Sequence, residues 1–146
     1  MSRPNARSRA RKLAMQALYQ WQLTGDAPRN VLAQFVAEHG ERRESAYFSE
    51  LFMAAADAAD ELDALAGRWL DRPMTQIDPI ERAILWCSLL ELRDYVEVPY
   101  RVVINEAVEL AKAYGGEAGH KYINAVLDRA AGELRPVEAA HRKRDE

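Results

Sequence analysis

Residues 98–131 have the sequence VPYRVVINEAVELAKAYGGEAGHKYINAVLDRAA, and this stretch decides the fold. Apolar residues recur at three- and four-residue intervals on both sides of Gly115-Gly116, which is the spacing of an amphipathic helix. Pro99 cannot lie inside a helix, and a glycine pair can take the left-handed conformation that ends one. The β-branched run from Val102 to Ile104 would also suit a strand, but the helical spacing continues well beyond it. The stretch therefore predicts two helices that bury their apolar faces in a common core.

The remaining sequence is also periodic and predicts an all-α bundle of about six or seven helices. At 146 residues, of which 49% are hydrophobic, the chain can build one sizeable core. We expect the domain to span residues 1–136, and residues 137–146 to form a disordered tail because they are mixed in charge and lack an apolar stripe. Besides the two helices of residues 98–131, helices are expected from Pro4 or Ser8 to about Leu23, from Pro28, from Ser45 past Leu65 as one long helix, and over 79–93, with a charged loop at 40–44.

Residues 79–93 predict the central helix. Asp78 suits the N-cap, Pro79 suits the first helical position, and the Glu81 carboxylate is placed to reach back to the Asp78 amide. Beyond this start, apolar residues surround almost the whole axis, so this helix should be the most buried one. Glu91 lies within the apolar region and should therefore need a hydrogen-bonding partner inside the fold.

Basic residues are concentrated at the N-terminus, although the formal net charge of the chain is −3. Cations at the start of a helix are repelled by the positive end of its dipole, and an anionic ligand would relieve that repulsion. The pattern suggests a local anionic partner such as RNA or DNA, although a short basic terminus is more often an ordinary solvated tail. The cations that precede the first acidic residue, Asp26, are Arg3, Arg7, Arg9, Arg11 and Lys12.

No sequence motif indicates catalysis, a cofactor or a metal centre. His39, His120 and His141 lack the His-Glu-x-x-His spacing, and the glycines form neither a Walker-type loop nor a Gly-x-Gly-x-x-Gly motif. The single cysteine, Cys87, excludes an internal disulfide and is expected in the core. No apolar run approaches the roughly 20 residues of a membrane span, and no secretory signal is visible, so we expect a cytoplasmic protein.

Four segments together resemble the NusB family of bacterial transcription antitermination proteins. They are AMQALYQWQL at 14–23, ERAIL at 81–85, VPYRVVINEAVELAK at 98–112 and HKYINAVLD at 120–128. The resemblance implies an all-helical RNA-binding protein, not an enzyme, that pairs with the small-subunit ribosomal protein NusE and recognises the boxA element of nascent RNA. It also implies a role in ribosomal RNA transcription, together with other Nus factors in the transcription elongation complex.

The resemblance and the basic residues together suggest two surfaces. On the first, cations would contact phosphates, while aromatic rings and polar side chains would stack on unpaired bases and read their edges. Core packing is the alternative for Tyr19 and Tyr114. The hypothesis requires the first helix to lie beside the turn that precedes the last helix. The candidate RNA-binding residues are Arg7, Arg9, Arg11, Lys12, Gln16, Tyr19, Tyr114, Lys121 and Tyr122, and the candidates at the NusE border are Ile77, Ile80, Glu81 and Arg82.

The sequence departs from the family just before His120. Members often have an acidic residue followed by serine there, and Ala118-Gly119 removes that carboxylate and hydroxyl from the expected RNA edge. One alternative function is RNA delivery, as in the NusB-like domain of some ribosomal RNA cytosine methyltransferases. A purely protein-binding helical module is a third alternative. The sequence leaves open whether the free protein is a monomer or a homodimer.

Overall fold

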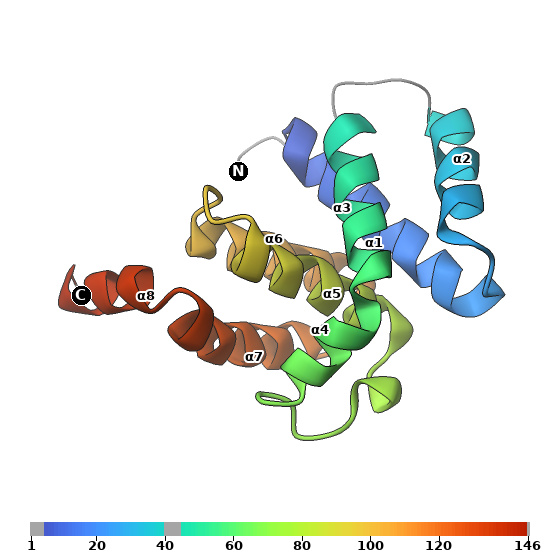
Figure 1. The fold of residues 1–146 in the computed structure, drawn as a ribbon. Coiled ribbons are helices and arrows are strands. Elements are labelled where there is room, and N and C mark those ends of the chain that lie inside the picture. Colours follow the sequence, from blue (N-terminus) through green and yellow to red (C-terminus); the bar gives the residue numbers. More distant parts are fainter. Residues whose placement is uncertain (1–4, 40–44, 146) are drawn as a thin grey trace.

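The computed structural model describes residues 5–39 and 45–145, and these residues form an all-helical bundle (Figure 1). Arg3 and the expected loop at 40–44 lie outside this range. Among the described residues, no helix has the length and apolar character needed to cross a membrane. The elements are α1 (Ala6–Thr24), α2 (Pro28–His39), α3 (Ser45–Asp57), α4 (Ala59–Ala66), a 3-10 turn η1 (Met74–Gln76), α5 (Pro79–Asp94), α6 (Tyr100–Tyr114), α7 (Gly119–Leu134) and α8 (Pro136–Asp145).

Helix α5 is the centre of the bundle, as its sequence predicts. Every residue from Ala83 to Leu92 is buried, and α1, α3, α6 and α7 pack around it. The Asp78 side chain accepts hydrogen bonds from the backbone amides of Ile80 (2.9 Å) and Glu81 (3.3 Å), which confirms the predicted N-cap. Cys87 also lies in this core, and burial raises the pKa of its thiol.

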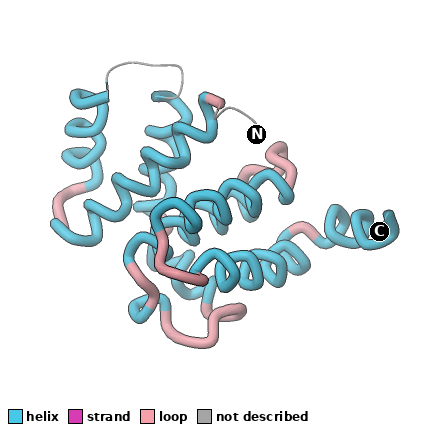
Figure 2. Tube along the Cα trace, turned by 180° about the vertical axis from the view of Figure 1, so that it is seen from behind, coloured by secondary structure: helices cyan, strands magenta, loops and turns pink. Residues whose placement is uncertain are grey.

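Helices α6 and α7 form the predicted pair and pack side by side (Figure 2). The connection between them differs from the expectation. Gly115 is extended, with φ −82° and ψ 176°, and the left-handed residue is Ala118, with φ 67°. Alanine in this region costs roughly 1–2 kcal/mol because its Cβ approaches the following carbonyl oxygen. The loop therefore places a strained residue directly before α7.

The described residues form eight α-helices, and the structure differs from the sequence prediction in two places. The long helix expected from Ser45 is interrupted at Ala58, so that α3 and α4 are separate. The expected disordered tail is wrong, because Pro136–Asp145 forms α8.

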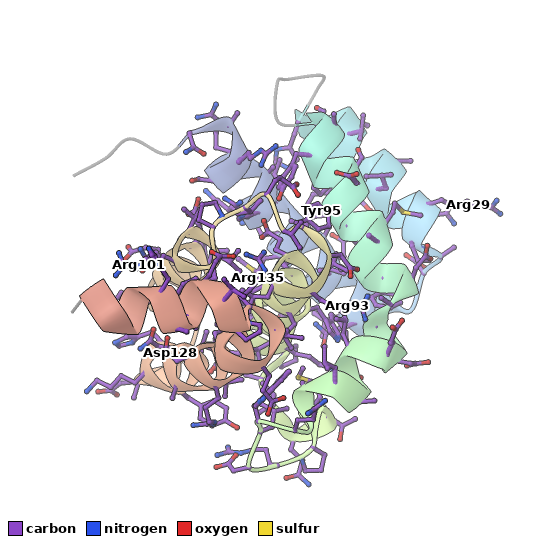
Figure 3. All side chains as sticks on the ribbon, turned by 60° about the vertical axis from the view of Figure 1, so that its left-hand side comes forward. Arg29, Arg93, Tyr95, Arg101, Asp128 and Arg135 are labelled. Carbon is purple, nitrogen blue, oxygen red and sulfur yellow. The ribbon has the colours of Figure 1, made fainter. Side chains whose placement is uncertain are left out.

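The start of α8 is held by contacts that the tail sequence does not reveal. Arg135 is 5% exposed and donates to the carbonyl oxygens of Leu92 (2.7 Å) and Val98 (3.0 Å). It also forms an ion pair with Glu138, whose carboxylate accepts from the Tyr100 amide at 3.1 Å. Figure 3 shows Arg135 where α8 joins the bundle. These bonds tie the C-terminal segment to the connection between α5 and α6.

Candidate nucleic-acid interface

The N-terminal half of α1 divides its cations between the surface and the core. Arg7, Arg9 and Lys12 are exposed, whereas Arg11 is only 4% exposed. The guanidinium of Arg7 lies 4.5 Å from the centroid of the Tyr47 ring, so this exposed cation also rests against α3. Of the four predicted phosphate contacts that the structure describes, three therefore lie where a large anion can reach them.

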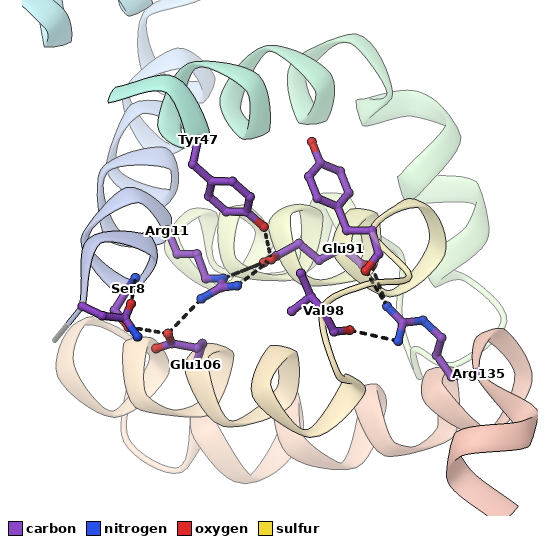
Figure 4. A network of polar contacts seen from close by, with 9 residues as sticks. Ser8, Arg11, Tyr47, Glu91, Val98, Glu106 and Arg135 are labelled. Atoms are coloured by element: carbon purple, nitrogen blue, oxygen red, sulfur yellow. Dashed lines mark hydrogen bonds and ion pairs between the residues drawn. The ribbon is translucent and has the colours of Figure 1, made fainter. Parts of the chain in front are cut away.

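Arg11 is the centre of a buried polar network that joins four helices (Figure 4). Its guanidinium donates to both carboxylate oxygens of Glu91 on α5 at 2.9 Å, and to Glu106 on α6 at 2.9 Å. Tyr47 on α3 donates to the same Glu91 carboxylate at 2.6 Å. Ser8 on α1 donates to Glu106. Burial alone would lower the pKa of Arg11, but the hydrogen bonds and charge of Glu91 outweigh burial and raise it.

The network changes one prediction and confirms another. The structure does not support the predicted phosphate contact at Arg11, because its fork of donors is already occupied by carboxylates in the core. The predicted need of Glu91 for an internal partner is confirmed, since Arg11 and Tyr47 both donate to it. Arg11 is therefore a structural residue that orients α1.

Lys12 and Tyr114 form the clearest surface pair among the candidates. The Lys12 ammonium lies 5.8 Å from the centroid of the Tyr114 ring, and Tyr114 keeps 39% of its surface exposed. Core packing therefore does not describe Tyr114. Gln16 and Tyr19, which follow Lys12 by one and two helical turns, are half-buried on α1. The pair joins α1 to the last residue of α6, beside the loop that leads into α7.

Tyr122 lies in a second cluster at the start of α7. Its hydroxyl donates to Asp71 at 2.7 Å, and the guanidinium of Arg72 lies 5.2 Å from the centroid of its ring. Hydrogen bonds from Arg72, and then from Tyr122, lower the pKa of Asp71 to about 2. The adjacent Lys121 is exposed. Arg72 is a cation that the sequence pattern does not reveal as part of this cluster, because Asp71 and Arg72 lie about fifty residues before Tyr122 along the chain.

These two clusters flank the short loop between α6 and α7. Tyr114 ends α6, and α7 begins at Gly119, so only residues 115–118 separate the helix that carries the first cluster from the helix that carries the second. Figure 2 shows this loop facing the viewer between the two helices. The first helix thus lies beside the turn before α7 through Lys12, as the sequence hypothesis requires.

The candidates for the protein-partner border gather where α5 begins. Ile80 and Glu81 are half-buried, but Ile77 is 7% exposed and belongs to the core, so it offers little surface. Arg82 donates to Asp63 at 2.7 Å and lies 4.8 Å from the centroid of the Trp86 ring. Its charge is therefore already compensated within the fold.

The described residues contain no group of three or more histidine, cysteine or acidic side chains that could hold a metal ion. The site instead combines exposed cations with half-exposed aromatic rings, and such a surface can contact phosphates and stack on bases.

Comparisons with known proteins identify relatives of this chain in sequence and in fold. A model of the NusB family matches residues 8–132. The transcription antitermination protein NusB of Stenotrophomonas maltophilia (strain R551-3) is 49% identical over 139 residues, which cover 94% of this chain and 87% of that protein. NusB of Nitrosococcus oceani is 45% identical over 134 residues, covering 92% and 90% of the two chains.

Solved structures show the same architecture. T. maritima NusB superposes with a TM-score of 0.83 at 26% identity, covering 97% of this chain and 99% of that one. A chain from the crystal structure of the antitermination factors NusB and NusE in complex with double-stranded RNA gives a TM-score of 0.79 at 25% identity, covering 88% and 97%. The family match and the identity to these relatives, together with the bundle around α5, show that this chain belongs to the NusB family of transcription antitermination proteins.

Proposed function

We propose that this chain binds a boxA-like segment of nascent RNA together with NusE, and so supports antitermination during ribosomal RNA transcription. The observation that carries the proposal is the Lys12–Tyr114 pair, a cation and a half-exposed ring at one end of the α6–α7 loop. The complex named for the structural relative, which holds NusB, NusE and RNA, supports the same assignment. The proposed role is that of a binding protein with no catalytic step, acting in the cytoplasm with other Nus factors of the elongation complex.

The exposed cations would supply affinity without reading sequence. Arg7, Arg9 and Lys12 lie along the first two turns of α1, and Lys121 lies at the start of α7. Cationic side chains that contact phosphates fix the position of a nucleic acid but carry no sequence information. Phosphate contacts therefore account for general RNA affinity in this proposal.

The aromatic and amide side chains would supply discrimination between sequences. Tyr114 offers an exposed ring face, and Gln16 and Tyr19 continue the same surface along α1. Tyr122 would act from the start of α7, with its hydroxyl held by Asp71. We propose unpaired RNA as the preferred ligand, because stacked rings need bases that are free of a double helix.

NusE would approach the start of α5. Ile80 provides a half-buried apolar contact there, and Glu81 and Arg82 provide charges at the rim. Charges at the rim of an interface affect the association rate more than the affinity. Ile77 would support this surface from the core.

A titration tests the proposal. A fluorescently labelled boxA-like RNA and a scrambled RNA of the same length are titrated with the protein, with and without NusE. We expect tighter binding of the boxA-like RNA and a further gain for that RNA when NusE is present. A duplex of the same sequence should bind more weakly than the single strand.

Equal binding of both single strands, with no gain from NusE, would exclude the antitermination role. Preference for a ribosomal RNA fragment over boxA would instead favour the RNA-delivery alternative. The sequence leaves open whether the free protein is a monomer or a homodimer, and sedimentation of the protein alone and with RNA distinguishes the two.

A further inference from the structure

Helix α7 begins without a capping side chain of its own. Its N-cap is Ala118, which is left-handed and provides no side-chain hydrogen bond to the helix. The first turn of α7 also contains no acidic residue. Unpaired amides at a helix start carry partial positive charge, which an acidic side chain normally compensates. At the start of α7 the Gly119 amide donates to the Gly116 carbonyl at 3.0 Å and the Lys121 amide to the Ala118 carbonyl at 3.1 Å, but no side chain of this turn compensates its positive charge.

The compensating group comes from α5. A Cβ atom added at Gly119 would lie 2.5 Å from Oε1 of Glu81 and 2.9 Å from its Cδ, so the carboxylate already fills the space where a side chain would stand. The same carboxylate lies near Gly116, where an added Cβ would be 3.8 Å from Oε2. Glu81 thus reaches both ends of the loop between α6 and α7. The capping pattern of α5 predicts that the Glu81 carboxylate reaches back to the Asp78 amide. The carboxylate instead lies against Gly119.

The surroundings of Glu81 agree with a packed, charged contact. Burial raises the pKa of Glu81, while its interaction with the Gly116 backbone amide opposes that rise by favouring the ionised form. A carboxylate held here compensates the positive end of α7. Gly119 is needed for this approach because it has no side chain.

We propose that Glu81 is a positioning residue for RNA binding, which packs from α5 against Gly119 at the start of α7 and fixes the loop that sets Tyr114 and Lys121 in register. The proposal rests on the RNA-binding function proposed above. For the removal of Glu81, it predicts a change in RNA affinity that is opposite in sign to the change expected from charge repulsion alone. Removal of an acid next to an RNA site should raise affinity through reduced repulsion, whereas loss of a positioning residue should lower it.

The experiment compares Glu81→Ala with Glu117→Ala. Glu117 is a matched control, because it is an exposed acid in the same loop. Affinity for the boxA-like RNA is measured without NusE, so that an effect of Glu81 on the protein partner does not enter. We expect Glu81→Ala to weaken binding roughly three- to tenfold, which lies within the range found for coupled neighbours. Glu117→Ala should leave affinity unchanged or slightly higher, and Glu81→Gln should retain part of the wild-type affinity.

A second variant removes the same contact from the other side. Alanine is a better helix former than glycine, so local propensity alone would favour Gly119→Ala. Its methyl group would instead displace the flexible end of Glu81. We expect Gly119→Ala to weaken RNA binding in the wild-type background and to have no further effect in the Glu81→Ala background.

Amide hydrogen exchange over residues 116–121 of the free protein tests the positioning role of Glu81 separately from the proposed boxA-binding function. Faster exchange in Glu81→Ala, with unchanged exchange in Glu117→Ala, supports the positioning role even if the wild type shows no preference for boxA. Unchanged exchange in Glu81→Ala would overturn it. The role would also be overturned by a rise in RNA affinity that matches Glu117→Ala, or by equal effects of Gly119→Ala in both backgrounds.

Discussion

Arg11 and Lys12 are consecutive cations on α1, yet they belong to different regions of the molecule. Arg11 is 4% exposed and donates to two carboxylates from α5 and α6. Lys12 is exposed and lies over the ring of Tyr114. Because each residue turns about 100° around the helix, two neighbours can face the core and the solvent. The role of a cation near this N-terminus thus depends on the acids that face it.

The buried network around Arg11 orients the exposed face of α1 that carries Lys12. The network around Arg11 draws together Ser8 on α1, Tyr47 on α3, Glu91 on α5 and Glu106 on α6. A buried ion pair is weak evidence for stability, since desolvation offsets much of its attraction, but its geometry is demanding. Fixing the rotation of α1 also fixes where Lys12 projects. The network therefore contributes to the surface without touching a ligand.

Arg11→Ala should have the largest effect on stability. Removing the guanidinium leaves Glu91 buried with only Tyr47 as a donor among the contacts described above. Breaking one partner of a buried pair costs about 3–5 kcal/mol, and urea unfolding followed by circular dichroism measures this loss.

Lys12→Ala is the matched control for that measurement. Its unfolding free energy should stay within about 0.5 kcal/mol of the wild type, as for other surface substitutions. A comparable loss in both variants would contradict the division between the two regions. At temperatures where Arg11→Ala remains folded, its free energy of RNA binding should change by less than its free energy of unfolding.

Local sequence patterns were sufficient for the centre of the fold. Asp78 and Pro79 mark the start of α5 because capping depends on residues within one turn. Glu91 also revealed its need for a partner, since it interrupts an apolar helix. Its partner Arg11 lies eighty positions away along the chain. No local pattern could identify that partner, so the sequence places Arg11 with the surface cations although the structure buries it.

The candidate site depended on contacts between distant segments in the same way. The periodicity of α6 placed Tyr114 on an apolar stripe, and only the resemblance to NusB suggested a surface role. The bond between Tyr122 and Asp71 could not be predicted, because a turn before α5 gives no sign of which helix it meets. The error at α8 has the same cause, since Arg135 anchors that helix to carbonyl oxygens of Leu92 in α5 and of Val98 in the α5–α6 connection.

Tyr47→Phe should have a smaller effect on the buried region. The hydroxyl donates to Glu91, but Arg11 continues to satisfy that carboxylate, so we expect a loss of about 1–2 kcal/mol at neutral pH. Burial, followed by the hydrogen bond with Glu91, raises the pKa of Tyr47 in the folded protein.

The raised pKa of Tyr47 also predicts a dependence on pH. A raised pKa in the folded state stabilises the protein below the pKa of the unfolded tyrosine, about 10, and this contribution is lost as the pH rises above it. Unfolding free energies measured between pH 8 and about 11 should fall less steeply for Tyr47→Phe than for the wild type. Part of the slope should remain, because burial also raises the pKa of Tyr95 to about 12. Identical slopes would show that Tyr47 is not held in the network.

The smallest predicted effect is the loss of RNA affinity on substitution of the exposed cation Lys12. Lys12→Ala should weaken binding of boxA-like and scrambled RNA by a similar factor, because a phosphate contact carries no sequence information. The slope of log affinity against log salt concentration should fall by about 0.7, the value for one contact with single-stranded RNA. Arg29→Ala removes the same charge from an exposed position on α2 (Figure 3) and should leave that slope unchanged. If both variants lose the same slope, general charge rather than the Lys12–Tyr114 pair determines RNA binding. Restoration of the slope in Lys12→Arg, with preserved stability, would locate the contact at this position of α1.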